Sequence, residues 1–214
     1  YSGGGGGSSS SSSSSSNGTI TAGTGATTST TTTSTGSVTG TAATSTQTTV
    51  QVTESGAKVT VTGTTQDATG TTMGLVGESA GNGAVTSGEA TVSVATGAAE
   101  FAGLDAINPT ATSTISALNS GADINTVLPS LGLGGYAQVG NTRAIIAKNA
   151  AGVDVPTTVE MYVSSLPANV SEVAIVCLNN STGQWIKLTA QVDPATKKVT
   201  FTVPGSCTIQ FRAK

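Results

Sequence analysis

The chain has 214 residues, of which 9% are charged and 3% are aromatic, and it contains no histidine. Without histidine the chain has no Ser-His-Asp or Cys-His catalytic group and no imidazole metal ligand. Its formal net charge of −3 argues against binding nucleic acid by counterion release. The sequence also has no run of about 18 apolar residues of the kind that spans a membrane. We therefore expect no cofactor, no nucleic-acid partner and no membrane insertion.

The chain begins with a low-complexity arm, residues 1–16, in which five glycines and nine serines follow Tyr1 and Ser2. Such a composition is typical of a flexible coil. A first residue other than Met fits a secretory leader already removed, so we expect a secreted or cell-surface protein. Four asparagines match the glycan acceptor pattern, which arises easily by chance in a chain so rich in Ser and Thr: Asn17, Asn169, Asn179 and Asn180.

The following region, residues 17–105, is rich in Thr and Gly and predicts β structure. Three segments alternate Val with polar residues, the pattern of a half-buried strand: 49–53, 58–62 and 91–95. The turn-like residues 54–56 predict a hairpin between the first two segments. Residues 19–48 combine β propensity with no apolar face. A strand there specifies its register poorly and is more stable when paired with a partner strand.

Residues 106–135 are interpreted as a connector that contains a short helix. Ile124 and Val127 recur at a helical interval, Asp123 is a candidate helix cap, and Pro129 ends the helix. The glycines at 132, 134 and 135 mark the boundary with the next region.

Residues 136–214 predict a β-sandwich domain. Its candidate strands, which are separated by turns that contain proline, are 142–148, 157–163, 171–178, 184–190, 197–203 and 207–213. Val173–Leu178 is apolar on both faces, as in an interior strand. For the whole chain we expect an all-β fold. We expect this fold to be an antiparallel sandwich of immunoglobulin-like or jelly-roll type, with a Thr/Gly-rich β region and an extended amino-terminal arm.

Two cysteines lie in this predicted domain. Cys177 is on the interior strand, and Cys207 begins the last strand in phase with Ile209 and Phe211. Both thiols therefore point towards one core. In an exported protein an even number of cysteines suggests a disulfide, here Cys177–Cys207. Two buried free thiols are the alternative.

Carboxylates are the remaining route to an active site. Five acidic residues are spaced about one per predicted strand and turn, and we interpret them as solvated turn charges instead of paired catalytic acids: Glu54, Asp67, Glu78, Glu89 and Glu100. The other aspartates stand alone, so no calcium loop is predicted. We expect a protein that is not an enzyme, with no catalytic residue and no metal ligand.

Trp185 is the one aromatic residue that suggests a sugar contact. It follows a turn and alternates with Lys187 and Thr189, while Ile186 and Leu188 take the opposite face of the strand. An exposed indole ring is a platform for a saccharide. The alternative is a tryptophan in a core or an interface.

Residues 157–214 resemble a β-sandwich module of secreted surface proteins of Gram-positive bacteria. The resemblance rests on Gly-Gln-Trp-Ile-Lys-Leu at 183–188, on Asp-Pro at 193–194 and on Val-Thr-Phe-Thr-Val at 199–203. It implies an exported structural role and no catalytic residues. No anchoring module follows within the sequence, which departs from the pattern of such proteins.

Charge is divided unevenly along the chain. Residues 1–135 carry seven acids and one Lys, and residues 136–214 carry seven bases and four acids. Head-to-tail neighbours would therefore attract each other. The alternative is a chance partition of a small number of charges. We expect a structural subunit of an extracellular fibre or surface layer, whose partner is itself. Assembly would be by insertion of an amino-terminal arm of roughly residues 1–48 into a neighbour, as in donor-strand complementation. The alternative is a monomeric adhesin or carbohydrate-binding module on a Gly/Ser linker, with a cell-surface polysaccharide as partner.

Overall fold

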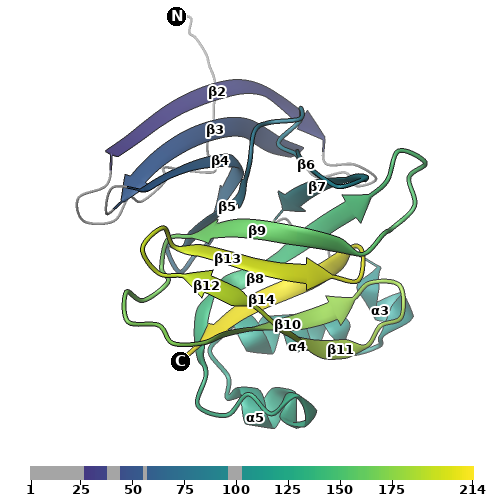
Figure 1. Ribbon diagram of the computed structural model, residues 1–214. Helices are drawn as coiled ribbons and strands as arrows, with labels where there is room; N and C mark the ends of the chain where they lie inside the picture. Colours follow the sequence, from purple (N-terminus) through teal and green to yellow (C-terminus); the bar gives the residue numbers. More distant parts are fainter. Residues whose placement is uncertain (1–26, 38–43, 55–56, 96–102) are drawn as a thin grey trace, which may run out of the picture.

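The computed structural model describes residues 27–37, 44–54, 57–95 and 103–214, and these residues form a sandwich of two antiparallel sheets (Figure 1). The seven-stranded sheet has the order β12 (Gln191–Asp193), β13 (Lys198–Val203), β9 (Thr157–Val163), β5 (Thr72–Val76), β4 (Ala57–Gln66), β3 (Thr44–Glu54) and β2 (Thr27–Ser37). The six-stranded sheet has the order β11 (Trp185–Thr189), β10 (Val173–Asn179), β14 (Cys207–Ala213), β8 (Ala137–Lys148), β7 (Ala90–Ala95) and β6 (Val85–Ser87). The predicted all-β sandwich is confirmed.

The main core lies between the two sheets. It takes one face of each strand, so that Met161 and Phe201 of one sheet meet Ile175 and Phe211 of the other. The rings of Phe201 and Phe211 lie edge to face with their centroids 5.6 Å apart. Burial of these side chains supplies the main driving force for closing the two sheets on each other.

The connector packs against the outer face of the six-stranded sheet. It contains three helices and a 3₁₀ turn: α3 (Leu104–Ile107), α4 (Ala111–Asn119), α5 (Ile124–Val127) and η1 (Pro129–Leu131). Leu118 and Ile124 bury Ala174 and Val176 of β10, whose side chains on this face are apolar. The Asp123 carboxylate accepts a hydrogen bond from the Asn125 backbone N–H, which confirms the predicted cap. None of the helices in the described residues is long and apolar enough to cross a membrane.

The Thr/Gly-rich region and residues 136–214, which differ in composition, both contribute strands to one sandwich. Strand β7 pairs with β8, and Val92 lies opposite Ala147 in this pair. Strand β5 pairs with β9, and Leu75 lies opposite Met161. The Thr/Gly-rich residues therefore supply strands to both sheets around a shared core, and residues 136–214 do not form the sandwich alone.

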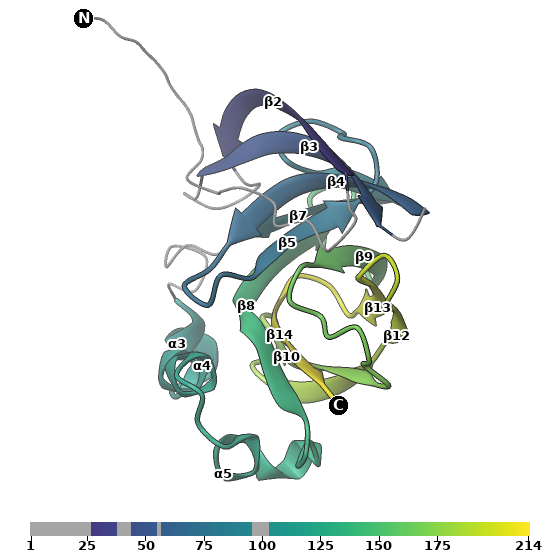
Figure 2. The same cartoon turned by 90° about the vertical axis from the view of Figure 1, so that its left-hand side faces the viewer.

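The strands nearest the amino terminus extend the seven-stranded sheet. The predicted hairpin is present as β3 and β4, with Val50 opposite Val61 and Val52 opposite Val59. Strand β2 pairs with β3 and is the last strand of this sheet in the described part of the chain. Figure 2 shows these strands at the end of the molecule farthest from the carboxyl terminus. The predicted arm, residues 1–16, lies outside the described residues.

Candidate functional site

The strands that the structure describes form four sheet edges, which differ in how they are protected. An edge strand presents unpaired backbone N–H and C=O groups, and proteins blunt such edges with short strands, charges or proline. Strands β6 and β12 have three residues each, and Pro194 follows β12. Strand β11 carries Lys187, which is exposed. These three edges are therefore protected against pairing with another chain.

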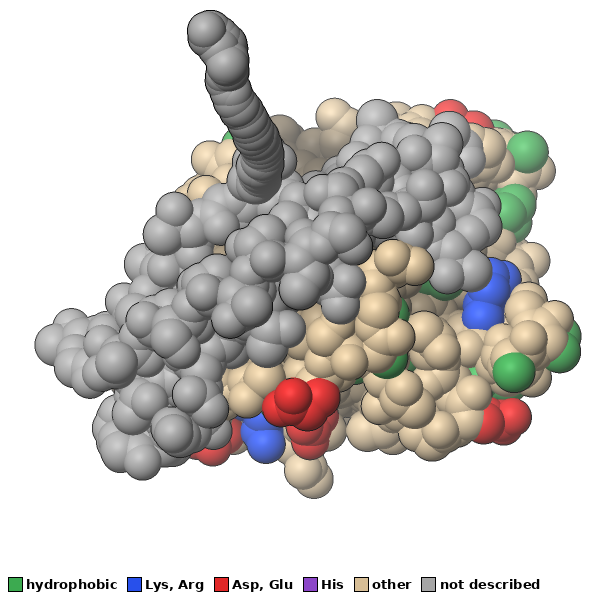
Figure 3. Space-filling model, turned by 90° about the horizontal axis from the view of Figure 1, so that it is seen from above, with side chains coloured by type: hydrophobic (Ala, Val, Ile, Leu, Met, Phe, Trp, Pro, Cys, Tyr) green, Lys and Arg blue, Asp and Glu red, His purple; other side chains and the backbone are tan. Residues whose placement is uncertain are grey.

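In the part of the chain that the structure describes, the edge formed by β2 has none of these protections. This strand has 11 residues and consists of Thr, Ser and one Gly, without charge or proline. It is as long as β3, to which it pairs, with a register shift between Thr32 and Thr35. Figure 3 views the molecule from above, and the side chains coloured there, which do not include those of β2, are mostly uncharged. A long, uncharged edge of this kind is a template for adding another strand.

A buried ion pair connects the two sheets at one end of the sandwich. Arg143 extends from β8 to the turn that follows β4, where its Nη1 lies 2.6 Å from Asp67 Oδ2. The Arg143 side chain is fully buried and that of Asp67 is 5% exposed. Arg143 also donates from Nε to the Thr65 hydroxyl and from Nη2 to the Thr71 carbonyl. Removal of either charge leaves the other one buried without its partner.

The Asp67 carboxylate is the centre of this arrangement. Burial by itself raises the pKa of Asp67, but hydrogen bonds from the Asn141 backbone N–H and from Thr69, together with the Arg143 guanidinium, outweigh burial and hold the pKa below its ordinary value. The sequence-based interpretation of Asp67 as a solvated turn charge is therefore wrong. The signal that could have revealed the pair is Arg143, because a cation directly before the apolar residues 144–147 of one strand requires a partner when the strand is buried.

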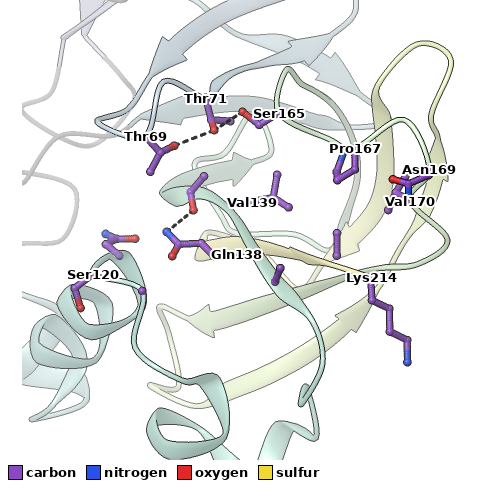
Figure 4. Close-up of a pocket in the computed structure, with 15 residues that line it drawn as sticks. Thr69, Thr71, Ser120, Gln138, Val139, Ser165, Pro167, Asn169, Val170 and Lys214 are labelled. Carbon is purple, nitrogen blue, oxygen red and sulfur yellow. Dashed lines mark hydrogen bonds between the residues drawn. The ribbon is translucent and has the colours of Figure 1, made fainter.

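A pocket of about 530 Å³ opens beside this ion pair. Figure 4 shows its walls, which are the β4–β5 turn, the beginning of β8, the β9–β10 loop and the last residues of the chain. The end of α4 completes it. Val139, Ala213, Pro167 and Val170 give the pocket an apolar floor and side. Polar groups of Thr69, Thr71, Ser165, Gln138 and Asn119 also line the pocket, together with Ser120, Gly121, Ala137, Gly140, Asn169 and Lys214.

Hydrogen bonds fix the polar side chains of this pocket. The Thr69 hydroxyl lies 2.5 Å from Asp67 Oδ1 and 2.9 Å from the Thr71 hydroxyl, which in turn lies 2.7 Å from the Ser165 hydroxyl. Gln138 donates from Nε2 to the Gly140 carbonyl at 3.0 Å and to Asn141 Oδ1 at 3.1 Å. These bonds hold the groups in place before any ligand binds.

Trp185 is not part of this pocket. It lies on the face of the six-stranded sheet that the helices cover and packs with Leu118 and with Leu104 and Leu178, half-buried. Its Nε1 is buried and has no hydrogen-bond partner among the described residues. Ile186 and Leu188 pack against the main core, as their alternation predicts. A sugar contact at Trp185 stays a prediction.

The two cysteines lie in the main core, as predicted from the strand phases. They are on neighbouring strands but not directly opposite each other, because Cys177 faces Ile209 and Cys207 faces Asn179. Both are free thiols in this structure. A hydrogen bond with the Cys177 thiol and burial raise the pKa of Cys207 well above its ordinary value. The disulfide between them stays a prediction.

The predicted glycan acceptors differ in their accessibility. Asn169 is exposed in the β9–β10 loop at the pocket, while Asn179 and Asn180 are half-buried at the β10–β11 turn. Asn179 Oδ1 accepts hydrogen bonds from the backbone N–H groups of Ser181 and Thr182. Asn17 lies outside the described residues. Glycosylation at these positions stays a prediction.

Comparison of the chain with protein-family models, with curated proteins and with solved structures gave no match. The resemblance of residues 157–214 to modules of bacterial surface proteins therefore stays a prediction.

Proposed function

We propose that the chain is a non-catalytic structural subunit of an extracellular fibre or surface layer, in which each subunit adds a strand to β2 of a neighbour. The length of β2 and the lack of charge and proline in it are the observation that carries this proposal, since β2 is the edge of its sheet among the described residues. Eleven residues offer a long row of backbone donors and acceptors, and backbone hydrogen bonds give strand addition its affinity. The edge has no charge to desolvate, which keeps the cost of burying it low.

The donor strand in this proposal is the amino-terminal arm of the neighbouring subunit. Strands β2 and β3 pair within their own chain, so the donor is taken from residues 1–26, which lie outside the described residues. These residues carry no charged side chain. Capture of an arm by the next copy is a head-to-tail contact, and such contacts propagate as filaments when they do not close into a ring.

Two kinds of variant test the assembly, with sedimentation velocity and negative-stain electron microscopy as readouts. Deletion of residues 1–26 removes the donor. Ser29→Lys with Thr31→Lys places charge on the acceptor edge, at positions that face Gln51 and Thr49 across the β2–β3 pair. We expect filaments from the full chain and monomers from both variants.

The matched control is Thr189→Lys with Gln191→Lys, which adds the same charge at two exposed positions on the edges β11 and β12. This variant is expected to assemble like the full chain. Dispersed single particles of the full chain at high protein concentration would contradict the proposal. Assembly that survives in both the deletion and the β2 variant would place the contact elsewhere.

The second candidate function is a monomeric adhesin or carbohydrate-binding module. The pocket beside the Arg143–Asp67 pair is the observation that favours it, because fibre assembly at β2 does not use a preformed cavity of about 530 Å³. The two functions are compatible, since a surface fibre whose subunits bind saccharide is itself an adhesin.

A further inference from the structure

We propose that the pocket between the β4–β5 turn, the beginning of β8 and the β9–β10 loop binds a neutral saccharide of one or two units. Its volume of about 530 Å³ lies within the ~300–1,000 Å³ range of small-molecule sites. Three features of the pocket favour such a ligand: the direction of its hydrogen bonds, the charges around it and its apolar floor. None of them depends on strand addition at β2.

The Asp67 carboxylate fixes the direction of the hydroxyl chain. An ionised carboxylate only accepts, and each hydroxyl has a single proton to donate. The Thr69 hydroxyl therefore donates to Asp67, the Thr71 hydroxyl to Thr69, and the Ser165 hydroxyl to Thr71. The Ser165 proton is thus used within the chain. Ser165 Oγ, at the exposed end, is left with lone pairs and accepts a hydrogen bond from a ligand.

Gln138 presents a second acceptor. Both protons of its Nε2 are used, one on the Gly140 carbonyl and the other on Asn141 Oδ1. Within the described residues no hydrogen bond reaches its Oε1. Asn119, by contrast, exchanges hydrogen bonds with the backbone N–H and the hydroxyl of Thr142. Ser165 Oγ and Gln138 Oε1 are therefore two fixed acceptor oxygens, and they favour a ligand that carries donors.

The charges around the pocket favour a neutral ligand. The lining contains a single charged side chain, Lys214. Its Nζ lies 3.6 Å from Glu172 and 4.8 Å from the centre of the Tyr136 ring, and Figure 4 shows it pointing away from the cavity. An anion thus finds no cation inside. A cation finds no free carboxylate, because Asp67 already accepts from Arg143 and from the β4–β5 turn.

A saccharide meets both requirements. Its hydroxyl groups supply several neutral donors close together, and its ring carries C–H faces that pack on aliphatic side chains. Val139, Val170 and Ala213 provide such a surface in the pocket. A peptide supplies one N–H per residue, each followed by a carbonyl that finds no donor at Ser165 Oγ or Gln138 Oε1. A saccharide is therefore the ligand that fits this pocket. The experiment below also tests a peptide, whose binding would contradict this assignment.

Saturation-transfer difference NMR on the full chain tests the proposal. The probes are glucose, galactose, mannose, N-acetylglucosamine, maltose, cellobiose, lactose and chitobiose. We expect transfer to at least one of them. Ser165→Ala removes one acceptor without touching the Thr71–Thr69–Asp67 bonds, and we expect it to weaken binding about threefold to tenfold. Ser165→Trp fills the exposed mouth and is expected to abolish binding.

Ser130→Ala and Ser130→Trp are the matched controls, because Ser130 is exposed in η1 and does not line the pocket. Both are expected to bind like the unmodified chain, and thermal unfolding of all four variants checks that they fold. The proposal is overturned if none of the eight sugars gives transfer. Binding that persists in Ser165→Trp overturns it as well. The proposal is also overturned if no sugar binds while acetate, ammonium or a Gly-Ser peptide does bind and loses this binding in Ser165→Trp.

If the saccharide experiment fails, the proposal of strand addition at β2 still stands. The Ser29→Lys, Thr31→Lys variant alters β2 and no residue of the pocket, so it is expected to lose assembly and keep saccharide binding. Ser165→Trp is expected to keep assembly and lose saccharide binding.

Discussion

Arg143 Nη1 and Asp67 Oδ2 lie 2.6 Å apart and join the two sheets of the sandwich. They are separated by 76 positions in the sequence. Arg143 lies in β8, while Asp67 belongs to the turn whose next residues line the pocket. The ion pair therefore holds the sandwich together at one end and also positions the pocket wall.

Replacing Arg143 by Met is expected to lower the free energy of unfolding by about 3–5 kcal/mol, because the Asp67 carboxylate then stays buried without its partner. Urea unfolding followed by circular dichroism measures this change. The double variant Arg143→Met with Asp67→Asn is expected to lose less than the sum of the two single variants, since no charge is left unpaired. Additive losses would show that the two side chains do not interact.

Asp67 is expected to make stability depend on acid pH. Its pKa in the folded protein is lowered, so its contribution is complete above its ordinary value of about 3.9 and is lost as the pH falls through the folded pKa. The difference in unfolding free energy between the unmodified chain and Asp67→Asn should shrink between about pH 5 and pH 2. Glu89→Gln, at an exposed position, is the control. A difference that stays constant with pH would assign no role to the charge of Asp67.

Gly140 is expected to tolerate no side chain. It has φ +75, and a Cβ there would lie 2.7 Å from Met73 Cε and 3.1 Å from Asp67 Oδ2. Gly140→Ala therefore combines backbone strain, of about 1–3 kcal/mol, with a collision at the pocket wall. Gly121→Ala is the matched control, because Gly121 has φ +85 with open space around it. Thermal or urea unfolding should show the larger loss for Gly140→Ala. Equal losses would mean that only the backbone strain matters.

The cysteine pair gives a prediction that mass spectrometry checks. Cys177 and Cys207 lie diagonally on neighbouring strands of one core, and a bond between them closes a loop of roughly 30 residues, which stabilises by about 3–4 kcal/mol in the chain-entropy model. After expression in an oxidising compartment, the intact mass should be lower by two hydrogens, and Cys177→Ser should unfold at lower denaturant concentration. Alkylation of both thiols after unfolding without reductant would show that they remain free.

The local pattern of apolar residues was sufficient to predict the strands in which Val alternates with polar residues or forms part of an apolar run. The alternating Val residues at 58–62 and 91–95 appear as β4 and β7, and the apolar run at 173–178 appears as the interior strand β10. Strands β5, β6 and β12 were not predicted, because they are three to five residues long and two of them lie among glycines. Short strands of this kind are stabilised by the neighbours that they pair with instead of by their own sequence.

The sequence by itself determined the class of the molecule: an all-β chain without histidine, with its cysteines on one core face and a long uncharged β segment near its amino terminus. Only the tertiary structure decided which strands pair beyond the β3–β4 hairpin, that Asp67 meets Arg143, and that Ser165 and Gln138 present acceptor oxygens to one pocket. The physical reason is that alternation reports a period of two along a single strand. The meeting of side chains from β8, the β4–β5 turn and the β9–β10 loop depends instead on how two sheets close around a shared core.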